Sequence, residues 1–407
     1  MDKETFDKSQ DYSRAKSRFG FFSSTFGLVK NIAFIKYDLL PKLWSISGCF
    51  MSRIAPVLPS FMGGILTQSM IFFAGTQLLS TILSLPFDYY HHFILEEKYG
   101  FNKQTVKLWV IDNIKSFALF MVIGNPLAAA FFKIIDVSGD SFIFYIMTFI
   151  LVVQLIAITI YPTLIQPLFN TLSPLEDGEL KTAIEKLAKD HKFPLTELYV
   201  IDGSKRSSHS NAYFTGLPWK KSIVLFDTLI EHSTVEETVA VLAHEIGHWK
   251  LNHIPKSLLF AQVHLFLVFS MFSGFINNNS LYSSFGFRTI KPTIIGFVLF
   301  SDIFTPVEGV MQFAHNLMSR TFEYQADNYA VDNGYSNVLA RSLLKMFTEN
   351  LGSIDADWLY SAYHHSHPIL PERLKGLGYV SEEKVGDVKV NVVETKEAEK
   401  TEENEEK

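Results

Sequence analysis

Long uncharged apolar stretches alternate with polar segments along this chain. They cover residues 54–87, 116–132, 141–175 and 257–287. A helix that crosses a bilayer needs about 20 mostly apolar residues, whereas an apolar run of about 10 to 14 residues is typical of a buried helix in a soluble enzyme. The pattern therefore predicts a membrane protein rather than a large soluble enzyme.

Six membrane segments are expected from this pattern. The first, residues 19–53, is interrupted by charged residues. It is predicted to be one long helix with a kink near Pro41, whose charges lie at the interface or face water. The other five segments are more apolar, and they cover residues 63–86, 106–132, 142–165, 258–276 and 293–318.

A polar region separates the fourth and fifth membrane segments. Residues 176–191 have the amphipathic period of a helix, and residues 197–202 and 222–227 have the composition of strands. A further helix is predicted to follow, capped by Ser233 or Thr234. The region is therefore expected to be a small α+β core carried by membrane helices.

The composition agrees with a membrane location and narrows the chemistry. Hydrophobic residues make up 48% of the chain, and its single cysteine, Cys49, excludes an internal disulfide and a cysteine-based metal site. The net charge of -6 arises largely from the acidic segment 381–407, which is predicted to be a disordered tail. No basic patch indicates a nucleic acid partner, and no cleavable signal peptide is expected.

The strongest chemical signal is the sequence HEIGH, which begins at His244. His244 and His248 lie four residues apart, so they share one face of a helix and can bind one ion, with Glu245 beside its open side. This arrangement is typical of a catalytic zinc helix with a glutamate base. Such a motif arises by chance in roughly a few per cent of chains of this length, so other residues must support it. His253 is expected to point away from the ligand face.

Glu323 is the candidate third ligand. Catalytic zinc commonly has two histidines and one glutamate as protein ligands, which leaves a fourth position for water. Two membrane crossings separate His248 from Glu323, so both are expected on the same side of the membrane. Asp327 lies one turn further and can hydrogen-bond the outer nitrogen of a ligating histidine. In the alternative interpretation, Glu323 and Asp327 form ordinary surface contacts.

A histidine cluster precedes Arg373 near the end of the chain. It consists of His364, His365 and His367, which lack the helical spacing expected of a metal site. One histidine and one arginine would instead suit an oxyanion as hydrogen-bond donors.

Four sequence blocks in this order resemble the type I CAAX prenyl proteases. This family consists of integral-membrane zinc metalloproteases that process farnesylated fungal mating pheromone and prelamin A. The resemblance covers nearly the whole chain up to the acidic tail. The blocks are GSKRSSHSNAYFTG (residues 203–216), VLAHEIGHW (241–249), SRTFEYQAD (319–327) and HHSHPILPERL (364–374).

The resemblance implies four groups of site residues, namely zinc ligands, a general base, a substrate-binding strand and two residues that assist near the scissile carbonyl. The zinc ligands are His244, His248 and Glu323, and the general base is Glu245. The substrate-binding strand consists of Asn211, Ala212, Tyr213 and Phe214. The two residues that assist near the scissile carbonyl are His367 and Arg373. Asp327 stays the expected hydrogen-bond partner of a ligand.

The expected fold is mainly α-helical. A polytopic ring of membrane helices encloses a water-filled chamber, and a small α+β gluzincin-like catalytic domain lies on the cytosolic side. The family normally has seven membrane helices, and this chain is expected to begin in the linker after the first. The expected regions are about four spans after a polar lead (1–170), the zincin core (171–256), a two-span hairpin (257–318), the third-ligand helix with the C-terminal catalytic segment (319–380) and the acidic tail (381–407).

The resemblance implies a metalloendopeptidase with one Zn²⁺ ion. It would cut prenylated CAAX proteins on the carboxyl side of the prenyl-cysteine, remove the last three residues and make a further N-terminal cut in the same substrates. Its expected partners are farnesylated proteins or peptides and membrane lipid, and a monomer is favoured. The implied location is the endoplasmic reticulum membrane, with the inner nuclear membrane as an additional one, and lysine-rich loops favour a cytosolic catalytic domain.

Two alternative functions stay open. One is a membrane quality-control metalloprotease that acts on unprenylated or misinserted proteins. The other is a zinc-stabilised channel or scaffold without hydrolytic activity.

Overall fold

The computed structural model describes residues 3–57, 64–217, 219–381 and 390–392. Its elements form two compact units that interleave along the chain. The sheet unit consists of Met1–Lys16, Ile158–Leu258 and Gln312–Lys407, and the helical unit consists of Ser17–Ala157 and Leu259–Met311. The helices that continue from one unit into the other are α1 (Lys3–Lys36), α7 (Phe142–Ile160), α11 (His253–Phe275) and α13 (Thr293–Asp332).

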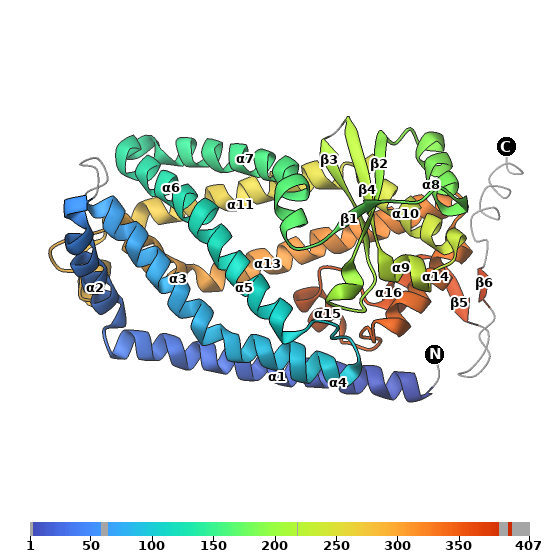
Figure 1. The fold of residues 1–407 in the computed structure, drawn as a ribbon, viewed down its shortest axis with the longest axis horizontal. Coiled ribbons are helices and arrows are strands. Elements are labelled where there is room, and N and C mark those ends of the chain that lie inside the picture. The colour runs from blue at the N-terminus through green and yellow to red at the C-terminus, as the bar shows by residue number, and fades with distance from the viewer. Residues whose placement is uncertain (1–2, 58–63, 218, 382–389, 393–407) are drawn as a thin grey trace, which may run out of the picture. The chain divides into compact units, whose positions relative to one another are not determined.

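Long helices make up the helical unit (Figure 1). Besides its parts of these four, it contains α2 (Leu39–Ile54), α3 (Ile65–Tyr90), α4 (Glu97–Tyr99), α5 (Val106–Leu119), α6 (Asn125–Ser138) and α12 (Asn279–Ser284). Wider π-helical turns at His91–Glu96 and Phe120–Gly124 join α3 to α4 and α5 to α6. Many apolar side chains of these helices are exposed, as is typical of helices that contact lipid.

Four helical stretches are long and apolar enough to cross a membrane, judged by length and composition within the described residues. They are Ile65–Tyr99, Val106–Leu168, His253–Phe275 and Thr293–Asp332. They correspond closely to the five more apolar segments predicted from the sequence. Val106–Leu168 includes two of these segments and a turn at Gly139 with a φ of 52°. The prediction of several membrane-spanning helices is confirmed.

The first expected segment differs from its prediction. The sequence predicts one helix with a kink near Pro41, but α1 ends at Lys36 and a separate helix, α2, starts after Asp38. Asp38 lies in the left-handed region with a φ of 50°, so the break precedes the proline. Lys42 Nζ donates a hydrogen bond to the carbonyl oxygen of Tyr37 (2.8 Å), which gives this carbonyl a partner at the break.

The core of the helical unit is largely aromatic. Phe272 of α11 is fully buried, and its ring centroid lies 5.4 Å from those of Phe297 and Phe300 of α13. Gly296 allows a close approach, since a Cβ atom there would lie 2.1 Å from the hydroxyl of Tyr282. Aromatic contacts therefore join α11 and α13 within this unit.

A four-stranded sheet lies in the sheet unit (Figure 1). In spatial order its strands are β1 (Leu172–Pro174), β2 (Leu195–Ile201), β4 (Lys220–Phe226) and β3 (Ala212–Leu217). Strands β2 and β4 are parallel, whereas β1 and β3 run antiparallel to their neighbours. The two predicted strands correspond to β2 and β4. Strand β3 is an edge strand, so one side of its backbone faces no other strand of the sheet.

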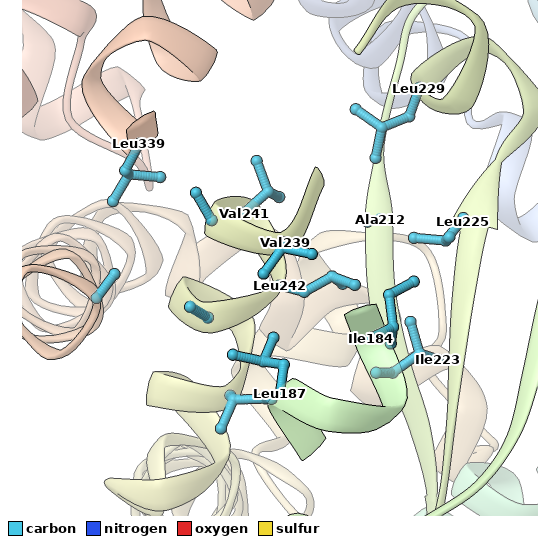
Figure 2. Close-up of a cluster of buried hydrophobic side chains, with 14 of the residues drawn as sticks. Ile184, Leu187, Ala212, Ile223, Leu225, Leu229, Val239, Val241, Leu242 and Leu339 are labelled. Atoms are coloured by element: carbon cyan, nitrogen blue, oxygen red, sulfur yellow. The ribbon is translucent and has the colours of Figure 1, made fainter. Parts of the chain in front are cut away.

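Further helices belong to the sheet unit, and the HEIGH helix, α10, supplies many of the buried side chains in its hydrophobic core. The helices are α8 (Glu179–Asp190), α9 (Asp227–His232), α10 (Val235–Lys250), α14 (Ser336–Glu349), α15 (Trp358–His364) and α16 (Leu370–Gly376). Figure 2 shows α10, with Leu242, between the strand that carries Ile223 and the helix that carries Leu339. These side chains are buried, and burying a leucine stabilises a fold by about 1.5 to 3 kcal/mol.

Of the two predicted caps, Ser233 and Thr234, the residue that caps α10 is Thr234. Its hydroxyl accepts a hydrogen bond from the N–H of Glu237 (3.2 Å), and the Glu237 carboxylate accepts one from the N–H of Thr234 (2.9 Å). This capping box satisfies two of the amide groups that a helix start leaves without partners. The start of the metal helix is therefore well defined.

The N-terminal residues belong to the sheet unit, whereas the sequence groups residues 1–170 as one membrane region. Ser9 is fully buried and donates a hydrogen bond to the carbonyl oxygen of Gly352 (2.9 Å). Long-range pairing of this kind leaves no local sequence signal.

The predicted disordered tail lies mostly outside the described residues. Within it, β6 (Val390–Val392) pairs antiparallel with β5 (Tyr379–Ser381). The valines of β6 favour a strand, so this short part of the tail differs from the prediction. Residues 382–389 and 393–407 are not described.

Candidate metal centre

Two histidines and one glutamate converge in the sheet unit. His244 and His248 lie one turn apart on α10, Glu323 lies on α13, and one ligand atom of each lies within 4.8 Å of the others. The Nε2 atoms of the two histidines are 3.1 Å apart. Glu323 Oε1 is 3.3 Å from His248 Nε2, and Glu323 Oε2 is 3.6 Å from His244 Nε2. The structure thus brings together the three residues predicted as ligands.

These distances fit a tetrahedral zinc site. Zinc binds imidazole nitrogen and carboxylate oxygen at about 2.0 to 2.2 Å, so neighbouring ligand atoms of a tetrahedron lie about 3.3 to 3.6 Å apart. Three protein ligands leave one corner for water or substrate, as in catalytic zinc sites. The residues present therefore suit a catalytic metal ion.

Gly247 explains how Glu323 reaches the histidines. A Cβ atom at this position would lie 3.1 Å from Cβ of Tyr329 and 3.2 Å from Cα of Ala326. Helices α10 and α13 therefore cross in close contact beside His248, at a point where a side chain would have to push them apart. The glycine weakens α10 by about 1 kcal/mol relative to alanine, and the close crossing accounts for that cost.

Asp327 holds the outer nitrogen of His244. Its Oδ1 lies 2.8 Å from His244 Nδ1, so a proton on Nδ1 leaves Nε2 free to bind a metal. Arg373 of α16 donates to the same carboxylate through Nε (2.9 Å) and Nη2 (2.5 Å), and its Nη1 lies 3.5 Å from Glu323 Oε2. Burial lowers the pKa of Arg373, but Asp327 and Glu323 outweigh this effect and raise it overall. The guanidinium therefore stays charged between the two acids.

His253 contacts the other ligand, although the sequence predicts that it points away. Its Nδ1 lies 2.9 Å from Nδ1 of His248, and its Nε2 lies 3.0 Å from Oε1 of Gln325. Asn252, which separates α10 from α11, has a φ of 57°, and this left-handed residue turns the chain back toward the metal helix. The prediction for His253 assumes that one helix continues from His248 to His253, so it does not include this turn.

Glu245 lines a cavity of about 430 Å³ together with the three candidate ligands. Burial raises the pKa of Glu245, although His244 and His248 act in the opposite direction. A carboxylate with a raised pKa is a stronger base than an exposed one, which suits proton transfer near neutral pH.

The predicted substrate strand lines the same cavity. Asn211, Ala212, Tyr213 and Phe214 all contribute to its wall, and the last three belong to the edge strand β3. Asn211 directly precedes the strand, and its carbonyl oxygen accepts a hydrogen bond from the N–H of Phe226 in β4 (3.1 Å). The open edge of β3 thus begins at the cavity.

His367 lines the cavity, whereas His364 and His365 do not. His367 Nε2 lies 3.3 Å from Glu323 Oε1, and 64% of its side chain is exposed. It therefore has room to contact a ligand in the cavity. A donor role toward the scissile carbonyl stays a prediction for both His367 and Arg373.

Arg320 supports the segment that carries His367, and it is not among the residues predicted from the sequence. It is buried, and its Nη2 donates to Glu372 Oε1 (2.7 Å) while Nη1 donates to the hydroxyl of Ser361 (3.0 Å). Arg320 lies three residues before Glu323, in a part of the helix that must be buried. This position is the sequence signal that could have indicated the role of Arg320.

Family models cover almost the whole chain. A model described as the CAAX prenyl protease N-terminal region with five membrane helices matches residues 1–171, and a model of peptidase family M48 matches residues 174–381. The boundary between them falls within the first strand of the sheet, β1 (Leu172–Pro174).

Individual relatives give the same result. The chain is 50% identical over 399 residues to CAAX prenyl protease 1 of Saccharomyces cerevisiae, a match that covers 94% of this chain and 88% of that protein. It is 39% identical over 415 residues to the CAAX prenyl protease 1 homolog of Homo sapiens, covering 93% and 86%. The crystal structure of Ste24p of S. mikatae has a TM-score of 0.88 and 50% identity, covering 93% of this chain and 90% of that chain. The chain therefore belongs to peptidase family M48, as a membrane metalloprotease of the CAAX prenyl protease type.

Proposed function

We propose that this protein is a zinc endopeptidase that cleaves prenylated CAAX proteins on the carboxyl side of the prenyl-cysteine and releases the last three residues. The observation that carries this proposal is the three-residue candidate metal site beside an open edge strand in one cavity. The names of the relatives support the class of substrate.

His244, His248 and Glu323 would hold the ion. When bound, zinc supplies a Lewis acid that makes water a nucleophile near neutral pH and polarises the scissile carbonyl. Glu245 accepts the proton of the attacking water and passes it to the leaving amine. His367 donates a hydrogen bond to the developing oxyanion. No side chain acts as a nucleophile.

The substrate peptide adds to the sheet as an extended strand beside Asn211 to Phe214. The edge position of β3 supports this arrangement, because its open side offers main-chain donors and acceptors. Recognition through the main chain requires an extended peptide but no fixed side chains. This suits a reaction whose substrates vary in their last three residues.

The membrane helices bring the protein to its substrate. A prenyl chain contributes about 0.8 kcal/mol of membrane affinity per buried CH₂ group, so a prenylated peptide is concentrated at the bilayer. We place the protein in the endoplasmic reticulum membrane, with the catalytic region toward the cytosol. Lysines in the α8 region support that orientation, since positive residues favour the cytosolic side.

Cleavage by the purified full-length protein in lipid vesicles tests the proposal. A farnesylated CAAX peptide is compared with the same peptide without the farnesyl group, each with and without a metal chelator, and zinc content is measured on the same sample. We expect one zinc ion per chain and chelator-sensitive release of the last three residues from the farnesylated peptide. Equal cleavage of both peptides would favour a quality-control protease, and a zinc-containing but inactive protein would favour a scaffold.

A further inference from the structure

The two candidate histidine ligands have different partners at their outer nitrogens. His244 faces a carboxylate, Asp327, as is common in metal sites. His248 instead faces a second imidazole, that of His253. An imidazole can either donate or accept at each nitrogen, so the direction of this hydrogen bond must be set by a further group.

The ring of His253 has a fixed position. The residue is 3% exposed, and its ring stacks on that of Phe322 with a centroid distance of 4.2 Å and an angle of 6°. Both ring nitrogens have a partner within 3.0 Å, namely His248 and Gln325. An apolar ring would fill this space equally well, so the two polar contacts point to more than packing.

Only one direction of hydrogen bonding is compatible with a metal on His248. If His253 donates a hydrogen bond from Nε2 to Oε1 of Gln325, its Nδ1 carries a lone pair and accepts a hydrogen bond from the N–H at Nδ1 of His248. The Nε2 atom of His248 then has a lone pair for the metal. The opposite direction places a proton on His248 Nε2 and blocks the site.

We propose that His253 is a positioning residue for the metal site, which takes its direction from Gln325 and keeps the Nε2 lone pair of His248 directed to the ion. Helix α13 then controls both histidines, through Asp327 for His244 and through Gln325 and His253 for His248. This inference rests on the proposed zinc site.

Zinc affinity, measured on the full-length protein in lipid by competition with a chelator, tests the proposal. Replacement His253→Phe keeps the stacking ring and removes both nitrogens, and we expect zinc affinity to fall by about 10- to 100-fold. His253→Asn, whose side-chain oxygen can replace the Nδ1 acceptor, should recover part of this loss. The matched control is His191→Phe, because His191 Nδ1 also contacts α13, at Tyr329 Oη (2.8 Å), without reaching a ligand.

The direction of the hydrogen bonds is tested at Gln325, which is exposed, so that its replacement does not endanger the fold. Gln325→Glu keeps an acceptor for His253, whereas Gln325→Lys offers only donors and forces the opposite direction. We expect the glutamate variant to bind zinc at least about tenfold more tightly than the lysine variant, beyond the effect of charge alone. The charge effect is measured with Asn328→Glu and Asn328→Lys, at another exposed position of α13.

Each outcome is decisive. Unchanged zinc affinity in folded His253→Phe, or a contrast at Gln325 no larger than that at Asn328, would overturn the proposal. If His253→Phe does not fold, the exposed Gln325 pair still decides. Absence of zinc binding in the parent protein would contradict the proposed function instead, so the two failures are distinguishable.

Discussion

Arg373 connects helix α16 to two acidic residues of the site through a single guanidinium. It makes two hydrogen bonds to Asp327 and lies near Glu323, while its backbone belongs to the C-terminal helix α16. Such paired hydrogen bonds need the planar fork of arginine, which lysine lacks. The contacts favour a role in organising the ligands over direct contact with the substrate.

We expect Arg373→Lys to lower zinc affinity by about 10- to 100-fold. Lysine keeps the charge but cannot hold both oxygens of Asp327, so His244 loses its fixed orientation. Zinc affinity and kcat are measured on the same samples. Normal zinc affinity combined with a reduced kcat would instead indicate a donor to the substrate.

Glu245 is the expected general base of the site. Replacement Glu245→Gln removes the base but not a ligand, so turnover of a farnesylated peptide should fall by about 10²- to 10⁴-fold while the zinc content stays at the parent level. Near-normal cleavage would contradict the assigned base. In the control variant Glu323→Ala, zinc content itself should fall.

At the scale of elements, the crossing of α10 and α13 determines whether the ligands meet. We expect Gly247→Val to destabilise the protein by about 1 to 3 kcal/mol, because the new side chain pushes against Tyr329 and Ala326. Zinc content should fall as well, since His248 and Glu323 move apart. The control is Gly274→Ala, because nothing lies within 4 Å of a Cβ atom there and alanine favours a helix. A parent-like melting temperature and zinc content for Gly247→Val would contradict this account.

A second element, α16, depends on the ion pair between Arg320 and Glu372. Burial alone would raise the pKa of Glu372, but hydrogen bonds from Arg320 and from the N–H of Ile369 outweigh it and lower the pKa below its ordinary value of 4.5. A carboxyl group of this kind stabilises the fold fully above pH 4.5. The contribution is lost as the pH falls through the pKa in the folded state.

We therefore expect a pH-dependent effect of Glu372→Gln. The variant should be less stable than the parent by about 1.5 to 3 kcal/mol at pH 7, and the difference should shrink as the pH falls below 4.5. Melting temperatures of both proteins across this range measure the effect. The exposed residue Glu349 supplies the control Glu349→Gln, and a difference that does not change with pH would contradict the expectation.

At the scale of the whole molecule, apolar runs and short motifs predict most of the fold and of the site. The runs identify the membrane helices because a bilayer requires their length, and the HEIGH spacing predicts His244, His248 and Glu245 because both histidines share one helix face. Glu323 follows from the count of membrane crossings. The family resemblance supplies the strand that begins after Asn211.

Other features depend on contacts that no local pattern encodes. The break at Asp38 and the turn at Asn252 each require a left-handed residue that is not glycine, for which the sequence gives only a weak signal. The return of Ser9 to Gly352 and the pairing of Arg320 with Glu372 join distant parts of the chain. Such long-range partners emerge only when the helices are packed.

The interleaving of the two units has a consequence for how the enzyme is made. The histidines precede the helical hairpin of residues 259–311 in the chain, and Glu323 follows it. A ribosome must therefore deliver that hairpin to a bilayer before the last ligand can join the first two. Synthesis in a cell-free extract should give a product without peptidase activity unless vesicles are present, and an active vesicle-free product would contradict this view. On this account, peptidase activity appears only after the hairpin has entered a bilayer.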